Sequence, residues 1–369
     1  MIRVSSPYIT EDDIETVASV LRSGMLAFGK VGEEFEKALA GYLGVKHVVA
    51  VSNGTAALYL SLRALGVGPG DEVVVPDFTF FATASTAILS GATPVLVDID
   101  LETYTIDVEE VERSLTDRTK VIVPVHLYGH PADMDVLLSL SKERNLLILE
   151  DCAQALGSEY RGVKVGSIGH AGALSFYPTK NITTCEGGAV SSNSDSVADY
   201  VRLARNHGQR GRYYHVMLGW NMRMTDVQAA LGISQLRRLN EMIEKRRRLA
   251  KLYLEELRGV TYLRLPSEKP WAKHTFNLFT VWVEGEGVRD KLASYLRENG
   301  VETAVHYPIP LHRQPALVNA KKSPGCCPKS EEASRHVLSL PLHPGLRDED
   351  ISTVSKLIKT FFAEQHLLG

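Results

Sequence analysis

From residue 47 onward, short runs rich in β-branched residues alternate with stretches of helical character. The runs cover residues 47–52, 71–76, 93–99, 119–127, 146–151, 173–178 and 188–192. This alternation is typical of a mainly parallel sheet covered by helices on both faces. The last two runs leave no room for a crossover helix, so one of them is expected to be antiparallel. We therefore predict an α/β fold with a mostly parallel seven-stranded sheet flanked by helices.

The length of 369 residues favours two domains. We expect a large domain over 1–245, which includes an N-terminal helical segment, and a smaller α+β domain over 246–369. Within the smaller domain, the pattern predicts strands at 276–283 and 301–306 and helices at 287–298 and 349–363. The stretch 308–329 contains Pro and Gly without periodicity and is expected to be a long loop.

Two capping-box pairs predict where helices begin. Thr10 and Asp13 precede an amphipathic helix whose apolar face is expected to pack inward. That face consists of Ile14, Val17, Ala18 and Leu21. Thr225 and Gln228 begin a long helical stretch that runs to about Leu257 and is expected to bridge the two domains.

Composition and charge argue against several classes of protein. The net charge of -3 provides no positive electrostatic field to attract nucleic acid. The basic run Arg246–Arg248 is interleaved with acidic residues in a predicted helix, which is typical of a solvated helix face. No segment approaches about 18 uninterrupted apolar residues and no signal peptide is apparent, so we expect a cytoplasmic protein without membrane contact. The glycines of 66–70 precede a strand, unlike a dinucleotide-binding fingerprint, and indicate a turn.

The four cysteines lack the spacing of a metal or redox site. Cys326 and Cys327 are adjacent, and neither Cys152 nor Cys185 has a CxxC partner. We expect reduced thiols and no metal.

Residues 52–56, Ser-Asn-Gly-Thr-Ala, lie where a strand ends and a helix begins. Free backbone N–H groups and the helix dipole favour a phosphate there, and Gly54 allows close approach. The same residues are equally good turn and N-cap formers, so this motif alone leaves both interpretations open.

Asp151 ends a predicted strand, and Lys180 follows another. Asp151 can pair with a protonated ring nitrogen, although a helix N-cap is the simpler interpretation of an aspartate at this position. Lys180 can form an imine with a carbonyl compound if burial lowers its pKa, although most lysines after strands are solvated. With one strand between them, both side chains can emerge at one edge of the sheet. The convergence of these motifs is more informative than any one of them.

At this point the chain resembles a known family, the DegT/DnrJ/EryC1/StrS sugar aminotransferases, which have the type I fold of pyridoxal-phosphate enzymes. The resemblance covers nearly the whole chain. It rests on several motifs in order, which include SNGTAAL, PDFTFFATASTAILSGATPVLVDID, LEDCAQALGSEYRGVKVGSIG, SFYPTKNITTCEGGAV, GWNMRMTDVQAALGISQL and VHYPIPLHRQP.

The resemblance implies roles for individual residues. Lys180 matches the Schiff-base lysine that also moves the proton, and Asp151 the carboxylate that keeps the pyridine nitrogen protonated. Gln154 matches the residue near the ring hydroxyl, and Phe80 the aromatic residue on the ring face. The phosphate cradle corresponds to Gly54, Thr55 and Ser175, with Asn221 donated by a neighbouring subunit. That last match implies a homodimer with shared active sites. On the substrate side, the resemblance points to His306, Tyr307, His312 and Arg223, each of which could also be a packing or surface residue.

By the same resemblance, the chain is expected to transfer an amino group, from glutamate, to a nucleotide-linked keto-sugar, with a 4-keto group slightly favoured over a 3-keto group. A dehydratase of this fold normally carries histidine at the position of Lys180, so the lysine argues against it. Two alternatives stay open. A cyclitol aminotransferase that acts on a keto-inositol shares every motif, and a regulatory protein could retain the fold without catalysis.

Overall fold

The computed structural model describes residues 1–366. A large sheet forms its centre, with strands in the order β1-β9-β8-β5-β4-β2-β3-β15. Their bounds are β1 (His47–Val51), β2 (Glu72–Pro76), β3 (Thr93–Val97), β4 (Thr119–Ile122), β5 (Leu147–Asp151), β8 (Ala171–Ser175), β9 (Gly188–Ser192) and β15 (Lys321–Lys322). All seven predicted strands are present. β9 pairs antiparallel with both β1 and β8, whereas the other pairs are parallel, so the expected antiparallel strand is the last one.

The eighth strand comes from the segment that was expected to be a loop. Residues 308–329 contain the 3₁₀ turns η2 (Leu311–Arg313) and η3 (Pro315–Leu317) and the short strand β15, which pairs in parallel with β3. Leu311 and Leu317 are buried in the core of the large sheet and hold the segment in place. The prediction of a seven-stranded sheet was therefore one strand short.

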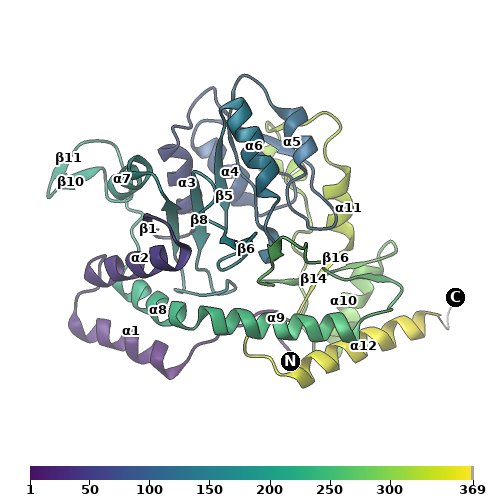
Figure 1. Ribbon diagram of the computed structural model, residues 1–369. Helices are drawn as coiled ribbons and strands as arrows, with labels where there is room; N and C mark the ends of the chain where they lie inside the picture. The colour runs from purple at the N-terminus through teal and green to yellow at the C-terminus, as the bar shows by residue number, and fades with distance from the viewer. Residues whose placement is uncertain (367–369) are drawn as a thin grey trace.

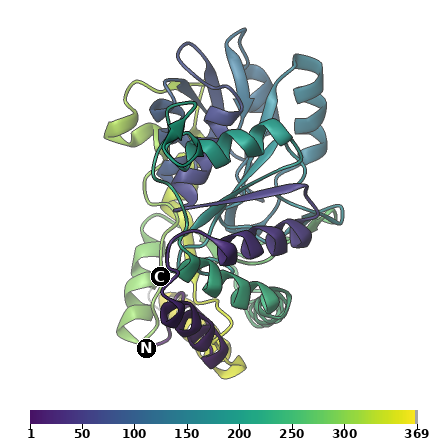
Figure 2. The same ribbon diagram turned by 90° about the vertical axis from the view of Figure 1, so that its left-hand side faces the viewer.

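Alternating side chains of the strands face two helical layers, which lie on opposite sides of the sheet (Figure 2). Val73 and Val75 pack towards α3, α4 and α7, whereas Val74 packs towards α5 and α6. The helices are α2 (Lys30–Leu43), α3 (Gly54–Ala64), α4 (Phe81–Leu89), α5 (Val108–Ser114), α6 (Met134–Arg144) and α7 (Asp195–Ala204). Burial on both faces explains why the strands are almost continuously apolar.

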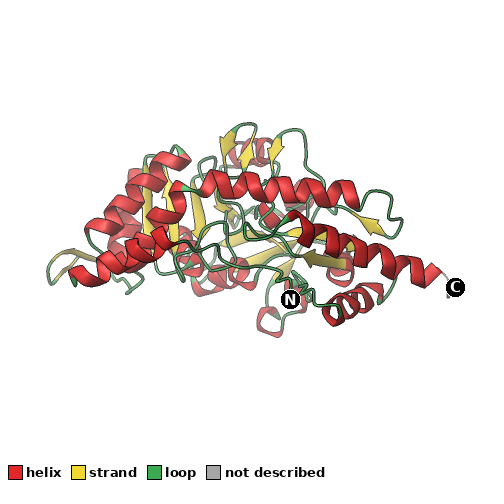
Figure 3. Cartoon of the chain, turned by 90° about the horizontal axis from the view of Figure 1, so that it is seen from below, coloured by secondary structure: helices red, strands yellow, loops and turns green. Residues whose placement is uncertain are grey.

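The long helical stretch is two helices, α8 (Asp226–Arg237) and α9 (Leu239–Glu256), with a break at Arg238, whose φ and ψ of -106° and 3° are not helical. The capping box of Thr225 and Gln228 begins α8 as predicted. α9 runs along the molecule beneath the large sheet (Figures 1 and 3). Its first part packs with the large-sheet core through Met242, and its second part with the C-terminal core through Tyr253. The domain boundary at residue 245 falls inside this helix and stays a prediction.

The C-terminal part has its own core around a three-stranded antiparallel sheet, β12-β14-β16. Its elements are β12 (Leu263–Arg264), β14 (Phe279–Val283), β16 (Val337–Leu340), α10 (Val288–Glu298), α11 (Pro328–His336) and α12 (Asp348–His366). The strand expected at 301–306 is reduced to single bridges, from Val301 to Ile2 and from Ala304 to Ser339. The predicted domain end, 369, lies outside the described residues.

The N-terminal helix α1 (Glu11–Ser23) begins at Thr10 as predicted, but a different face points inward. Ile14 and Leu21 are 53% and 54% exposed, whereas Asp13 is fully buried because its carboxylate pairs with Arg238 at 2.6 Å. An ion pair with Arg238, at the break between α8 and α9, therefore sets the rotation of α1 and leaves apolar side chains on the outside. No helix among the described residues has the length and apolar character needed to cross a membrane.

Candidate active site

A cavity of about 550 Å³ opens where β1, β2, β5 and β8 end. In open α/β sheets, ligands bind beyond the carboxyl ends of the strands, and this cavity has that position. Nine of the twelve site residues predicted from the sequence line it. They are Gly54, Thr55, Phe80, Asp151, Gln154, Ser175, Lys180, His306 and Tyr307.

Lys180 lies in the connection between β8 and β9, where its backbone N–H bonds the carbonyl of Tyr177 at 2.9 Å. Its amino group projects into the cavity. Burial lowers the pKa of Lys180 to about 8, and the charge of Asp151 partly opposes this shift. At pH 7 about a tenth of the amine is then neutral, against a few parts in about ten thousand for an ordinary lysine. Lys180 is thus prepared to act as a nucleophile.

This pKa predicts the reactivity of the cofactor-free protein. Acylation of Lys180 by a small amine-reactive reagent should rise with pH with a midpoint near pH 8 and level off above it, because only the neutral amine reacts. In Asp151→Asn the midpoint should move to lower pH, since the charge that raises the pKa is gone. Peptide mapping of the labelled protein measures both. The exposed Lys142 serves as the reference and should show an ordinary lysine profile; a similar profile at Lys180 would contradict the account.

Asp151 ends β5 and is 4% exposed. Its carboxylate accepts hydrogen bonds from the Thr83 hydroxyl at 2.9 Å and from the Ala153 backbone N–H at 3.1 Å. Burial raises the pKa of Asp151, while these hydrogen bonds and Lys180 act against the rise. A buried carboxylate of this kind favours a ligand that brings positive charge, such as a protonated ring nitrogen.

The N-terminus of α3 faces the same cavity. The Asn53 side chain caps the helix by accepting the Ala56 N–H at 2.8 Å, and the first residues after it are Gly54 and Thr55. Gly54 lies against Ser175: a Cβ on Gly54 would come within 2.8 Å of the Ser175 Cβ. Backbone N–H groups, two hydroxyls and the helix dipole together form a cradle for an anion such as phosphate.

Polar contacts hold in place the part of the cavity wall that contains Gln154, His306 and Tyr307. The Gln154 side chain donates to the Tyr307 hydroxyl at 2.9 Å and accepts the Tyr128 N–H at 2.8 Å. His306 bonds Ser339 through Nδ1 at 3.0 Å, and burial together with the Lys180 charge lowers its pKa to about 4. His306 is therefore neutral near pH 7. Phe80 is 58% exposed and lines the cavity, with its ring centroid 6.1 Å from that of Tyr307.

Comparison with known proteins places this geometry in a family. Residues 7–359 match the model of the DegT/DnrJ/EryC1/StrS aminotransferase family. The chain belongs to this family.

Individual relatives cover nearly the same length. A pleiotropic regulatory protein of Geobacillus stearothermophilus is 38% identical over 98% of both chains. A dTDP-3-amino-3,4,6-trideoxy-alpha-D-glucose transaminase of Streptomyces venezuelae is 42% identical over 89% of this chain and 86% of its own. A structure described as a sugar aminotransferase of Streptococcus pneumoniae, in its PLP form, has a TM-score of 0.91 and 32% identity over 98% of both chains.

This DegT/DnrJ/EryC1/StrS protein is a sugar aminotransferase that depends on pyridoxal phosphate (PLP), and its cavity fits that cofactor. Lys180 offers an amine to an aldehyde, Asp151 a carboxylate to a ring nitrogen, and the start of α3 a cradle for phosphate. The absence of a Cβ at Gly54 is what leaves that cradle open.

Gly54→Ala should therefore weaken PLP binding by about 5- to 150-fold, because overpacking of this degree costs about 1–3 kcal/mol. Titration of the cofactor-free variant with PLP measures the effect. Gly41→Ala is the matched control, since Gly41 also lies in a helix and a Cβ there would meet nothing within 4 Å. Unchanged PLP affinity in Gly54→Ala would show that the phosphate binds elsewhere.

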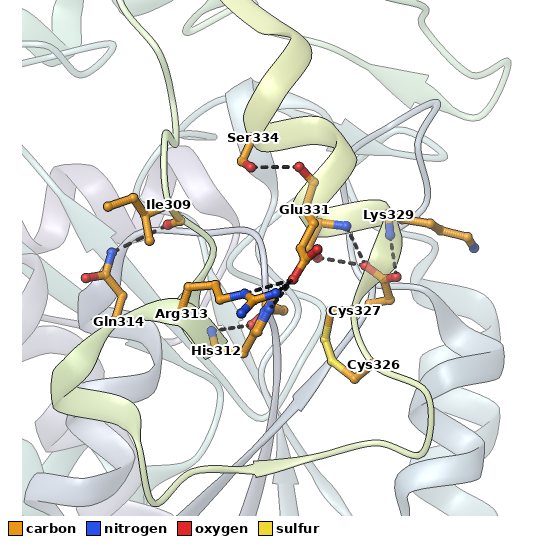
Figure 4. Close-up of polar contacts among 12 residues, drawn as sticks. Ile309, His312, Arg313, Gln314, Cys326, Cys327, Lys329, Glu331 and Ser334 are labelled. Atoms are coloured by element: carbon orange, nitrogen blue, oxygen red, sulfur yellow. Dashed lines mark hydrogen bonds and ion pairs between the residues drawn. A yellow bond between two sulfur atoms is a disulfide. The ribbon is translucent and has the colours of Figure 1, made fainter. Parts of the chain in front are cut away.

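Three predicted residues do not line the cavity of their own chain. His312 binds Asp77 through Nδ1 at 2.6 Å and Glu331 through Nε2 at 2.9 Å (Figure 4) and does not line the cavity, so its direct contact with substrate stays a prediction. Arg223 donates to the Asn206 side chain at 2.6 Å, away from the cavity. Asn221 is exposed and outside the cavity. A role for Asn221 in a neighbouring subunit stays a prediction.

Sequence reasoning missed other cavity residues. Thr83 holds Asp151, and it lies one helical turn after Phe80, so the position of Phe80 could have indicated it. Val4 and Ser5 reach the cavity from the N-terminal segment, and Asn277 from just before β14. These three lie far from the other motifs in sequence, and only the folded chain brings them together.

Within the described residues, two groups of side chains have the spacing of metal ligands. In the first, Glu150 already accepts three backbone N–H groups, which together with His126 satisfy its oxygens. In the second, Asp77, His312 and Cys327 lie together, and both ring nitrogens of His312 already bond carboxylates. The expectation of reduced thiols stays a prediction. The expectation of no metal stays a prediction.

Proposed function

We propose that the chain transfers an amino group from glutamate to a keto carbon of a nucleotide-linked sugar. The observation that carries the proposal is the meeting of Lys180 and Asp151 in one cavity beside the N-terminus of α3. When bound, PLP supplies an electron sink that allows a proton to leave the carbon bearing nitrogen. Lys180 is placed to remove and return that proton, and Asp151 to hold the positive charge that the sink requires.

The space around the cavity supports a substrate larger than a simple sugar. A second cavity of about 590 Å³ adjoins the first, and the two share Asn53, Thr55 and Glu186. Trp220 and Tyr59 form an aromatic wall in this second cavity, with ring centroids 5.1 Å apart. An aromatic wall of this kind suits the base of a nucleotide. The ring position of the keto group stays a prediction: the sequence slightly favoured carbon 4, and the transaminase of Streptomyces venezuelae is named for carbon 3.

The test is a substrate panel with purified PLP-loaded protein and glutamate. The panel contains nucleotide-linked 3-keto and 4-keto sugars and, as the cyclitol alternative, a keto-inositol; formation of 2-oxoglutarate reports transfer. We expect turnover with a nucleotide-linked sugar well above that with keto-inositol, and none with Lys180→Ala. A preference for keto-inositol would make the protein a cyclitol aminotransferase. Failure with every keto compound would support the regulatory alternative.

We also propose that two copies form a homodimer with shared active sites. Apolar side chains are exposed on α1 and on the projecting β10–β11 hairpin (Gln209–Gly211 and Tyr214–His215; Figure 1). Tyr213 and Leu218 are 78% and 89% exposed, and Asn221 follows shortly after. Surface of this kind is typical of an interface. A second copy seated there would cover it and bring Asn221 close to the other subunit's cavity.

Mixed dimers give a specific prediction. Asn221→Ala and Lys180→Ala should each be impaired alone. After both are unfolded, mixed and refolded together, about a quarter of the wild-type activity should return, since half of the dimers are mixed and each contains one intact site. Steady-state rates of the mixture and of each variant treated alone measure this. If Asn221 served its own subunit, no activity would return.

A further inference from the structure

Lys180 lines a small pocket in addition to the large cavity at the strand ends. The free volume of about 10 Å³ holds the centre of one small ion or one water molecule and leaves no room for an organic acid. Arg246 of α9 forms another part of the wall, and Ser6 of the N-terminal segment a third. Pro7 and Tyr8, which also line this space, are exposed, so a small solute can enter from solvent. We call this space the Arg246 pocket.

Arg246 is a buried cation whose hydrogen-bond partners are uncharged. The sequence indicated a solvated helix face for residues 246–248, but Arg246 is 2% exposed, so that prediction was wrong for this residue. Its Nη1 donates to the backbone carbonyls of Leu342 at 2.8 Å and Asn277 at 3.3 Å, whereas its Nε has no partner. Burial lowers the pKa of Arg246 to about 10, so the guanidinium is still charged at neutral pH.

The other two buried arginines of the described chain each pair with a carboxylate. Arg205 pairs with Glu36 at 2.5 Å, and Arg289 with Asp290 at 2.5 Å. Arg246 has no such ion pair with any of the residues 1–366. A buried charge without a counter-charge costs about 3–5 kcal/mol. Arg246 therefore lacks a negative charge that the described part of the chain does not supply.

The wall of the Arg246 pocket carries positive charge and unused hydrogen-bond donors. Its two charged side chains are Lys180 and Arg246, and no carboxylate lines it. The Lys180 amino group and the Ser6 hydroxyl donate no hydrogen bond within the described residues. Burial and the charge of Arg246 lower the pKa of His343 to about 4, so this neighbouring ring is neutral near pH 7. A water molecule could fill the space but could not balance the two positive charges.

Two buried carboxylates approach these groups, and both have other partners. Asp13 pairs with Arg238 at 2.6 Å, and Gln235, which lines the Arg246 pocket, donates to the same carboxylate at 2.9 Å. Asp151 lies in the large cavity, where its carboxylate accepts the Thr83 hydroxyl at 2.9 Å. Neither carboxylate reaches the wall of the Arg246 pocket. The counter-charge must therefore come from a solute.

We propose that the Arg246 pocket binds a small monovalent anion of the size of chloride, held by the guanidinium of Arg246 and the amino group of Lys180. The anion accepts hydrogen bonds from these donors and supplies the missing negative charge. An opposite charge within about 4–6 Å raises the pKa of a lysine by about 1–3 units. A rise of about one unit leaves about a tenth as much neutral amine at pH 7. The bound anion thus limits the amine that can bond to an aldehyde.

The first test is the acylation profile of Lys180 in the cofactor-free full chain, measured in sodium chloride and in sodium gluconate at the same ionic strength. Gluconate is too large for the Arg246 pocket. We expect the midpoint to lie about one pH unit higher in chloride and to approach a limit as the chloride concentration rises. The exposed Lys142 should have the same midpoint in both salts. Equal midpoints at Lys180 would overturn the proposal.

Replacements in the basic run show whether Arg246 holds the anion. Arg246→Gln removes the charge and should abolish the difference between the two salts, whereas Arg246→Lys retains a cation and should keep part of it. Arg248→Gln is the matched control, because Arg248 is exposed and pairs with Asp348 at 2.7 Å; it should keep the whole difference. Circular dichroism confirms folding. A folded Arg246→Gln protein with the full difference would place the anion elsewhere and refute the site.

Crystals of the wild-type chain grown in bromide test the site without any replacement. Bromide scatters anomalously and resembles chloride in size and charge. We expect a bromide peak in hydrogen-bond contact with the Arg246 guanidinium. A water molecule at this position, with no bromide peak, would contradict the proposal. None of these measurements involves PLP or a substrate, so their result is independent of the proposed function.

Discussion

Lys180→Ala should abolish amino transfer, with a fall in kcat of at least about 10³-fold, while the fold persists. General acid–base catalysis alone contributes about 10²- to 10⁴-fold, and the variant also loses the amine that bonds to PLP. The fold should persist because Lys180 lies in a cavity and not in a core cluster. Steady-state rates measure the loss, and circular dichroism and melting temperature measure the fold.

Lys142→Ala is the control for this experiment, because Lys142 is an exposed helical lysine far from the cavity in sequence and absent from its lining. Its rate should equal that of the wild type. Near-normal turnover by Lys180→Ala, with an intact fold, would show that another group moves the proton and that the proposed mechanism is wrong.

Asp151→Asn should have opposite effects on catalysis and on the stability of the cofactor-free protein. Loss of one partner from a buried charge pair costs about 3–5 kcal/mol, so kcat/KM should fall at least about 10²-fold. In the cofactor-free fold, however, burial raises the pKa of Asp151 above its unfolded value. The carboxylate is then harder to ionise when folded, and its contribution to stability is lost as pH rises through the folded pKa.

At pH 7 the cofactor-free Asp151→Asn protein should therefore melt at the same temperature as the wild type or higher, whereas with PLP bound the wild type should be the more stable. Melting curves with and without PLP, together with steady-state rates, test both statements. Asp199→Asn, on an exposed face of α7, should change neither. A cofactor-free Asp151→Asn protein that melts well below the wild type would contradict this account. It would mean that the negative charge of Asp151 stabilises the cofactor-free fold.

Local patterns were sufficient to predict the large sheet. Strands buried on both faces must be apolar for their whole length, so runs such as Glu72–Pro76 stand out in the sequence. β15 could not be found this way, because Lys321 and Lys322 are exposed, and Lys321 joins the sheet through backbone pairing with β3 and an ion pair with Glu72, 249 positions earlier. The orientation of α1 also escaped prediction, since it depends on the ion pair between Asp13 and Arg238 across 225 positions of sequence.

The candidate site also contains residues that local sequence patterns predict and residues that they do not. Lys180, Asp151 and Gly54 could be named in advance because each lies at or just after the end of a strand, and parallel strands end at one edge. His312 could not be placed correctly, since its position depends on Asp77, a residue 235 positions earlier. A residue's chemistry can be inferred from its neighbours in sequence, whereas its partner depends on the fold.

The central claim is that Lys180 and Asp151 act on opposite ends of one PLP ring. A crystal structure of the chain with PLP tests it most directly. The account predicts a continuous covalent link between the Lys180 Nζ and the cofactor, and a ring nitrogen about 2.7–2.9 Å from an Asp151 carboxylate oxygen. A cofactor bonded to another residue, or a ring nitrogen facing a group other than Asp151, would contradict it.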